Sequence, residues 1–354
     1  MKRFFDNPAG SKSNKSNSNK RRSIAAVIIT VLIFSLIFTM VSCNQQSGGN
    51  GTKVLNIGVI QFAPHPSLDN CYEGFVQGLK EAGFVDGENI KIDFQNAQGE
   101  MSNSDMIAKN MAASKYDMIV GIATPAAMSA YSAAKDNDIP VIFTAVSDPV
   151  AAGIVKSLER PEYNVTGTSD VLPLEAQLKM IRAFLPEARK IGVVYTTSEP
   201  NSVSHLSQFR ELAGKYGFEI AEAGVTSASE VAAAAMTVVS KGVDCINNFT
   251  DNNVVNNLSS VLHAADGAGI PVFGSEVEQV KNGCLASESI DYVSLGVETG
   301  KMAASVLKGE TKASEMAVKL ISDSTPVYNS SVLERLGLAL PAEYEGAEDA
   351  AAAK

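Results

Sequence analysis

Short apolar runs alternate with amphipathic stretches from residue 54 to about residue 310. The runs are rich in Val and Ile and are nearly continuous, which is typical of parallel strands covered on both faces. They predict strands at 54–62, 90–97, 118–123, 140–146, 190–196, 219–225, 245–249 and 271–275. The stretches between them carry apolar residues at helical spacing, which predicts helices at 68–83, 202–217 and 294–309.

This pattern runs through the chain twice. Each half opens on a similar strand, IGVIQF from Ile57 and IGVVYT from Ile191, and continues with a helix that ends at Gly83 or Gly217. Two copies of one strand–helix unit predict an α/β fold with two similar doubly wound parallel-sheet lobes. A hinge and an interlobe cleft would separate the lobes.

The same pattern suggests where each lobe begins and ends. We expect the N-terminal lobe to hold 54–167 plus about 288–317, and the C-terminal lobe 168–287 plus about 318–341. The segment 163–170 would be the first crossover, and 318–329 and 331–341 would close the second lobe. Residues 342–354 have no apolar periodicity, which predicts a disordered tail.

The N-terminal residues read as an export signal. A basic segment precedes an uncharged run from Ile24 to Ser42, and Cys43 and a polar spacer follow. This order resembles a bacterial lipoprotein signal, which implies a signal peptide at 1–43 with lipidation at Cys43 and a flexible linker at 44–53. The alternative is an uncleaved membrane anchor, because the apolar run is about long enough to span a bilayer. Both interpretations place the rest of the chain outside the cytoplasm, attached to a membrane.

Charge narrows the possible partners. Residues 1–42 hold seven basic residues and one acid, so without them the net charge falls from −10 to −16. Such an acidic domain is repelled by nucleic acid and by anionic lipid.

Three further cysteines, Cys71, Cys245 and Cys284, form no C-x-x-C pair, and we interpret them as buried apolar residues, although one disulfide stays possible.

Polar residues follow most of the predicted strands. In open α/β sheets ligands bind beyond the carboxyl ends of strands, where helix N-termini present free N–H groups. Thr124 and the N–H of Ala126 follow one strand, and Asp148 follows the next. In the second half Asn201, Asp251 and Glu276 hold equivalent places. Helix capping explains each residue alone, whereas convergence of both halves favours a ligand site.

Signatures of catalysis are missing from the sequence. It contains no G-x-S-x-G, no P-loop, no H-E-x-x-H and no paired metal-ligand cysteines, and its three histidines lie far apart. Only His65 lies at a predicted strand end. We therefore expect neither an enzyme nor a cofactor or metal, because a binding protein needs only a polar lining.

Several of these segments together resemble a known family, the lipoprotein substrate-binding components of ABC importers of the tryptophan/tyrosine uptake branch. The matching segments lie in order between residues 57 and about 310, and FTAVSDPVAAGIV followed by NVTGTSD is the most specific. Others include IVGIATPAA, FTDNNVV, IPVFGSE and LGVETGKMAASVLKGE. The resemblance implies a type I periplasmic-binding fold that closes on an amino acid with a bulky side chain.

The resemblance also implies roles for individual residues. Thr124, Ala126 and Thr144 would hold the ligand carboxylate, and Asp148 and Glu276 would be candidates for its ammonium group. Glu276 departs from the family pattern, where Asp is expected. The remaining lining would come from Gln61, Thr168, Ser169, Asn201, Ser202 and Asp251. The chain contains no Trp, so stacking on the ligand would use Phe62, Tyr195 or Phe249.

We therefore expect a membrane-anchored receptor that delivers an aromatic or branched-chain amino acid to an ABC permease and its ATPase subunit. A ligand sensor that signals through a partner protein is the alternative, because the same two lobes serve both tasks. An extracellular enzyme is a third hypothesis, and it lacks a catalytic cluster.

Overall fold

A six-stranded parallel sheet forms the centre of the first lobe. The computed structural model describes residues 54–351, which belong to one structural unit. The strand order is β11-β5-β4-β3-β1-β2. The strands are β1 (Leu55–Gln61), β2 (Ile90–Asn96), β3 (Met118–Ile122), β4 (Val141–Thr144), β5 (Val165–Asp170) and β11 (Lys319–Ile321). All five residues of β3 and all four of β4 are buried, as expected for strands covered on both faces.

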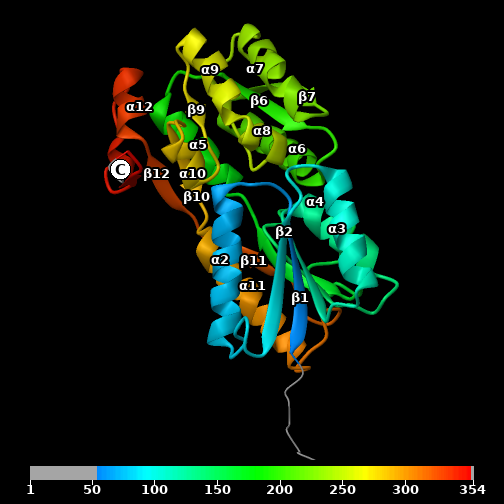
Figure 1. Cartoon of the computed structure of the whole chain (residues 1–354). Coiled ribbons are helices and arrows are strands. Elements are labelled where there is room, and N and C mark those ends of the chain that lie inside the picture. Colours follow the sequence, from blue (N-terminus) through cyan, green and yellow to red (C-terminus); the bar gives the residue numbers. More distant parts are fainter. Residues whose placement is uncertain (1–53, 352–354) are drawn as a thin grey trace, which may run out of the picture. The chain divides into compact units, whose positions relative to one another are not determined.

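Two pairs of helices cover this sheet. On one face α2 (Pro66–Glu81) packs against α11 (Tyr292–Leu307), and on the other α3 (Met101–Ala113) packs against α4 (Thr124–Ala134), as Figure 1 shows. Glycines allow the backbones of α2 and α11 to touch. A Cβ at Gly78 would lie 2.2 Å from the carbonyl oxygen of Val297, and one at Gly296 would lie 2.2 Å from that of Cys71.

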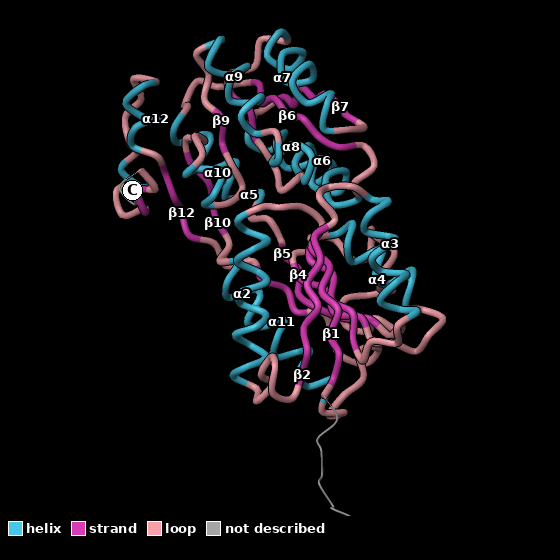
Figure 2. The backbone as a smooth tube through the Cα atoms, viewed as in Figure 1, coloured by secondary structure: helices cyan, strands magenta, loops and turns pink. Residues whose placement is uncertain are grey.

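The second lobe contains two smaller sheets (Figure 2). The parallel sheet has the order β7-β6-β8-β9, and in the other sheet β12 pairs antiparallel with β10 and parallel with β13. The strands are β6 (Lys190–Thr196), β7 (Glu219–Val225), β8 (Cys245–Asn247), β9 (Val272–Phe273), β10 (Ala286–Ser289), β12 (Thr325–Tyr328) and β13 (Glu348–Asp349). The helices are α5 (Leu174–Phe184), α6 (Pro200–Ala213), α7 (Val231–Ser240), α8 (Asn252–Asn256), α9 (Leu258–Ala268), α10 (Val277–Lys281) and α12 (Ser330–Arg335), with short 3₁₀ turns at Gly214–Tyr216, Ala228–Glu230 and Ala342–Tyr344.

Three connections join the lobes. They are 171–173 between β5 and α5, 290–291 between β10 and α11, and 322–324 between β11 and β12. Ser324 donates a hydrogen bond of 2.9 Å to Glu288, which ties the third connection to the end of β10. Short segments of this kind can absorb the backbone rotation of a hinge motion.

The predicted strands and helices up to residue 309 agree with the structure to within a few residues at their ends. Two connecting segments differ from expectation. The segment 163–170 was expected to cross between the lobes, but its residues 165–170 form β5, paired with β4 and β11. Glycine is required at position 167, because a Cβ there would lie 2.0 Å from the carbonyl oxygen of Phe143. The crossover follows β5.

The second difference concerns the C-terminal segments. Residues 318–329 were expected to close the second lobe, but they divide between two sheets: β11 joins the first-lobe sheet, and β12 pairs with β10. The expected tail at 342–354 is ordered as far as residue 351. Tyr344 is buried and packs against Phe184, with ring centroids 5.5 Å apart, which gives the segment apolar contacts that its sequence period does not reveal.

Other sequence expectations concern the cysteines and the N-terminal residues. Cys71, Cys245 and Cys284 are buried and form no disulfide within residues 54–351, and burial raises the pKa of each thiol. The predicted signal peptide, Cys43 and the linker lie outside the described residues. Among residues 54–351, no helix combines the length and apolar character needed to cross a membrane.

Candidate functional site

A cavity lies between the lobes, at the carboxyl ends of both parallel sheets. The first lobe contributes His65, Ser67, Leu68, Ala123, Thr124, Ala145, Ser147, Asp170 and Tyr292. The second lobe contributes Asn201, Thr250, Asp251, Asn252, Val255, Asn256 and Glu276. We call this space the central cavity.

Glu276 is a buried carboxylate in the central cavity. It precedes α10, its side chain is 1 % exposed, and neither carboxylate oxygen accepts a hydrogen bond from the described residues. His65 Nε2 from the first lobe lies 3.3 Å from one of these oxygens. A buried carboxylate without hydrogen bonds costs free energy, so an arrangement of this kind suits a positively charged ligand group.

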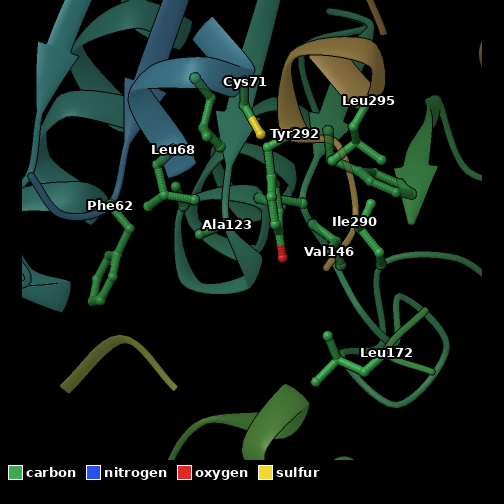
Figure 3. Packing of buried hydrophobic residues seen from close by; sticks show 14 of the residues in the cluster. Phe62, Leu68, Cys71, Ala123, Val146, Leu172, Ile290, Tyr292 and Leu295 are labelled. Atoms are coloured by element: carbon green, nitrogen blue, oxygen red, sulfur yellow. The ribbon is translucent and has the colours of Figure 1, made fainter. Parts of the chain in front are cut away.

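Asp170 supplies a second buried carboxylate, at the end of β5. It accepts hydrogen bonds from Tyr292 at 2.9 Å and from Ser147 at 3.1 Å. Burial raises the pKa of Asp170 to about 6, although both hydrogen bonds oppose that shift. The carboxyl group is therefore mostly ionised at neutral pH. Figure 3 shows Tyr292 next to Cys71, with its hydroxyl group pointing away from Cys71.

The helix α4 begins at Thr124, which lines the cavity. Among residues 54–351 no side chain caps this helix, so its first N–H groups and the positive end of its dipole can receive an anion. Ala123 and Ala145, which line the cavity after β3 and β4, have φ angles of 77° and 54°. Such angles are strained for alanine, and strain of this kind gathers at ligand sites.

Both carboxylate oxygens of Asp251 accept hydrogen bonds from other groups of the protein. It caps α8 by accepting a bond from Val254 N–H, and it also accepts bonds from Thr196 N–H, the Thr196 hydroxyl and Ser202. These contacts fix the loop after β8 against the end of β6. The neighbouring Asn201 is also buried, but its Oδ1 atom has no partner among the described residues.

The structure brings four of the predicted site residues to the central cavity, namely Thr124, Asn201, Asp251 and Glu276. The other predicted residues are not among those that line it. Gln61 bonds to Ala63 O and Asp69, Thr168 bonds to Thr144 and Thr299, and Ser169 bonds to Ser147 O. Ala126 is buried within α4, and Ser202 donates to Asp251.

Asp148 lies at a contact between the lobes and does not line the central cavity. One of its oxygens accepts a hydrogen bond of 2.6 Å from Ser204 on α6, and the other accepts one of 2.9 Å from Ala151 N–H. With both oxygens engaged, this carboxylate has less capacity for a ligand ammonium than Glu276 does.

The cavity also contains residues that sequence reasoning missed, above all Ser67, Asp170, Thr250 and Tyr292. Asp170 could have been found, because it ends the segment that was interpreted as a crossover and is in fact a strand. Tyr292 begins α11, far along the chain from the other lining residues, and no local pattern indicates its place. Within residues 54–351 no cluster of His, Cys, Asp and Glu could hold a metal ion.

The aromatic residues considered for stacking lie elsewhere. Phe249 packs edge-on against Phe209 in the second lobe, with ring centroids 5.3 Å apart. Phe62 lines a separate hollow beside the cavity, and Tyr195 is partly buried beside Gly224. Tyr292 is the aromatic side chain among the residues that line the central cavity.

Comparison with known proteins identifies this architecture. A family model described as ABC transporter substrate binding protein matches residues 56–345. A tyrosine-binding protein of Clostridioides difficile is 39 % identical over 328 residues, which cover 90 % of this chain and 93 % of the relative.

Solved structures of similar sequence also include substrate-binding proteins. A domain from Streptococcus pneumoniae in complex with L-Trp has a TM-score of 0.80 and 38 % identity, and the match covers 84 % of this chain and 99 % of the other. The ligand-free, open form of a substrate-binding protein with adhesive properties from Clostridium difficile has 42 % identity over the same shares, but a TM-score of 0.65.

More distant structures share the fold alone, among them a leucine-binding protein from Thermotoga maritima at 15 % identity and a TM-score of 0.56. Two lobes that each contain a parallel sheet, a cavity lined by side chains of both lobes and a family match over most of the described residues lead to one conclusion. The chain belongs to the family of ABC transporter substrate-binding proteins.

Proposed function

We propose that this protein binds an aromatic amino acid of the tyrosine or tryptophan class in the central cavity and delivers it to an ABC permease. The observation that carries the proposal is the buried, unbonded carboxylate of Glu276 in a cavity that also receives the uncapped N-terminus of α4. These groups complement the ammonium and the carboxylate of one amino acid. The names of the similar proteins support the same ligand class.

The ligand would bridge the lobes. Its ammonium group would lie against Glu276 of the second lobe and Asp170 of the first, and its carboxylate against Thr124 and the first turn of α4. The Ser67 hydroxyl, which is buried without a partner among residues 54–351, is available to the same carboxylate. The side chain would extend toward the loops after β6 and β8.

Closure of the lobes would give the transport signal. A ligand that contacts both lobes stabilises the closed form by its higher affinity for that form. The permease and its ATPase subunit would then recognise the closed protein. The three connections between the lobes are short, which fits a hinge motion with little change inside each lobe.

A thermal-shift screen of the full chain against the amino acids and simple sugars tests the ligand class. We expect tyrosine and tryptophan to raise the melting temperature most, because binding to the folded state alone stabilises it. At a hundredfold excess over Kd the gain is about 2.7 kcal/mol. A response to sugars with none to amino acids would overturn the proposed ligand.

Membership of this family implies that the protein functions outside the cytoplasm. We propose that a lipid on Cys43 anchors it to the membrane. The signal peptide would span 1–43 and the linker 44–53. In cells fed an alkyne-labelled fatty acid, the wild-type chain should acquire label and fractionate with membranes. Cys43→Ser should lose the label and, if processing stops, keep the apolar segment. Label on both proteins would contradict lipidation at this position.

A further inference from the structure

Asn201 carries an unused hydrogen-bond acceptor in the wall of the central cavity. It lies in the first turn of α6, directly after the loop that follows β6, and its side chain is 2 % exposed. Its Oδ1 atom has no hydrogen-bond partner among residues 54–351. A buried amide oxygen without a partner costs free energy, so its retention at a cavity points to a ligand donor.

The surroundings of Asn201 determine which way its amide faces. Nδ2 donates to the carbonyl oxygen of Thr250 at 3.2 Å and to a carboxylate oxygen of Glu199 at 3.3 Å. Because the nitrogen has two acceptors in the protein, the oxygen is the atom left for the cavity. Glu199 is held in turn by the N–H and side-chain amide of Asn252, at 3.2 and 2.8 Å.

Asn201 and Glu276 lie at opposite ends of the second-lobe wall. Asn201 follows β6 and Glu276 follows β9, and β8 lies between these strands. Neighbouring strands are about 4.8 Å apart, which separates the two strand ends by roughly 10 Å. If Glu276 takes the ammonium group, the acceptor at Asn201 faces the distal part of the ligand side chain.

We propose that Asn201 Oδ1 accepts a hydrogen bond from the phenol O–H of tyrosine or the indole N–H of tryptophan, and so selects these ligands over phenylalanine. The inference rests on the proposed function and assigns one specificity-determining residue within it. Phenylalanine has no donor on its ring and would leave Oδ1 buried and unpaired. Sites built to bond a ligand O–H or N–H reject the analogue that lacks it.

Glu199 acts as a positioning residue in this scheme. Its carboxylate accepts from Nδ2 and so keeps the oxygen of Asn201 toward the cavity. In Glu199→Gln the new amide can donate to Asn201 Oδ1, which allows the Asn201 amide to turn its NH₂ toward the cavity. The preference for a donor-bearing ligand should then fall, while the affinity for phenylalanine is retained.

Calorimetry of the full chain with L-tyrosine, L-tryptophan and L-phenylalanine tests the proposal. We expect wild type to bind tyrosine at least about tenfold more tightly than phenylalanine, since one hydrogen bond left unmade in a buried site has this order of effect. Asn201→Leu, which keeps the branched shape of the side chain but removes its hydrogen-bonding atoms, should bring the ratio to about one by weakening tyrosine alone. Glu199→Gln should lower the ratio partly. Asn253→Leu, the same change outside the central cavity, should preserve it.

Each other outcome has a definite meaning. An equal loss of tyrosine and phenylalanine affinity in Asn201→Leu would overturn the inference, because it would place the amide at the common head group. An unchanged ratio in that variant would overturn it as well. Wild type that binds none of the three amino acids would instead reject the proposed function, so the two failures are distinguishable.

Discussion

Replacing Glu276 by Gln is expected to weaken binding of the amino-acid ligand by about 2–4 kcal/mol, or roughly 30- to 1000-fold in Kd. The side chain keeps its size, but the buried charge that faces the ligand ammonium is lost. The unliganded protein should be nearly as stable as wild type, because neither oxygen of Glu276 accepts a hydrogen bond from residues 54–351 and its nearest positive partner is His65 Nε2 at 3.3 Å. Calorimetry and thermal unfolding without ligand measure the two effects separately.

Glu278→Gln is the matched control for this variant. Glu278 lies two residues further on, in α10, and forms its ion pair with Lys281 at 2.9 Å outside the central cavity. Its replacement should leave Kd within about twofold of wild type, as expected for a rim charge. Equal affinities in Glu276→Gln and wild type would show that the ammonium group lies elsewhere, with Asp170 or Asp148 as the next residues to test.

The second large effect concerns folding stability. Gly78→Ala is expected to destabilise the protein by about 2 kcal/mol or more, because the added methyl group would lie 2.2 Å from the carbonyl oxygen of Val297. Neither backbone can move aside without separating α2 from α11, which pack together on the first-lobe sheet. This loss exceeds the roughly 1 kcal/mol that alanine gains over glycine in a helix. Urea unfolding monitored by circular dichroism measures the difference.

Gly267→Ala makes the same change in a helix with free space. A Cβ at Gly267, within α9, meets no atom within 4 Å, so the variant should be more stable by about 0.4–1 kcal/mol. The opposite signs of the two variants separate close packing from helix propensity. If Gly78→Ala were as stable as wild type, the contact between α2 and α11 would have to be looser than the structure shows.

Much of the architecture was predictable because it depends on local pattern. Continuous Val- and Ile-rich runs are compatible with strands buried on both faces, and strands of that kind need helices on each side. The errors occurred where the local signal was weak. Four of the six residues of β5 are glycine, serine or threonine, which gives a weak strand signal, and in the structure β4 and β11 lie on either side of it.

The site residues also differ in whether local sequence pattern could predict them. Polar residues after strands β3, β6, β8 and β9 could be assigned to a cleft from sequence, because the carboxyl ends of parallel strands share one edge of a sheet. Thr124, Asn201, Asp251 and Glu276 were found in this way. Asp148 occupies an equivalent place after β4, yet its loop takes it to Ser204 on the other lobe. The ends of the strands indicate the region in which the site lies, and the conformation of each loop decides which side chains line the cavity.

The sequence by itself determined the two-lobed α/β class, the repeat of one unit and the family resemblance, since each depends on the order and period of residues along the chain. Only the tertiary structure decided that Asp170 and Tyr292 share a cavity with Glu276, and that Gln61, Thr144 and Thr168 do not line it and form hydrogen bonds within the protein. The physical reason is that hydrogen bonds and burial arise between segments distant in sequence. Whether a carboxylate is already bonded, as in Asp251, or unbonded, as in Glu276, depends on those distant partners.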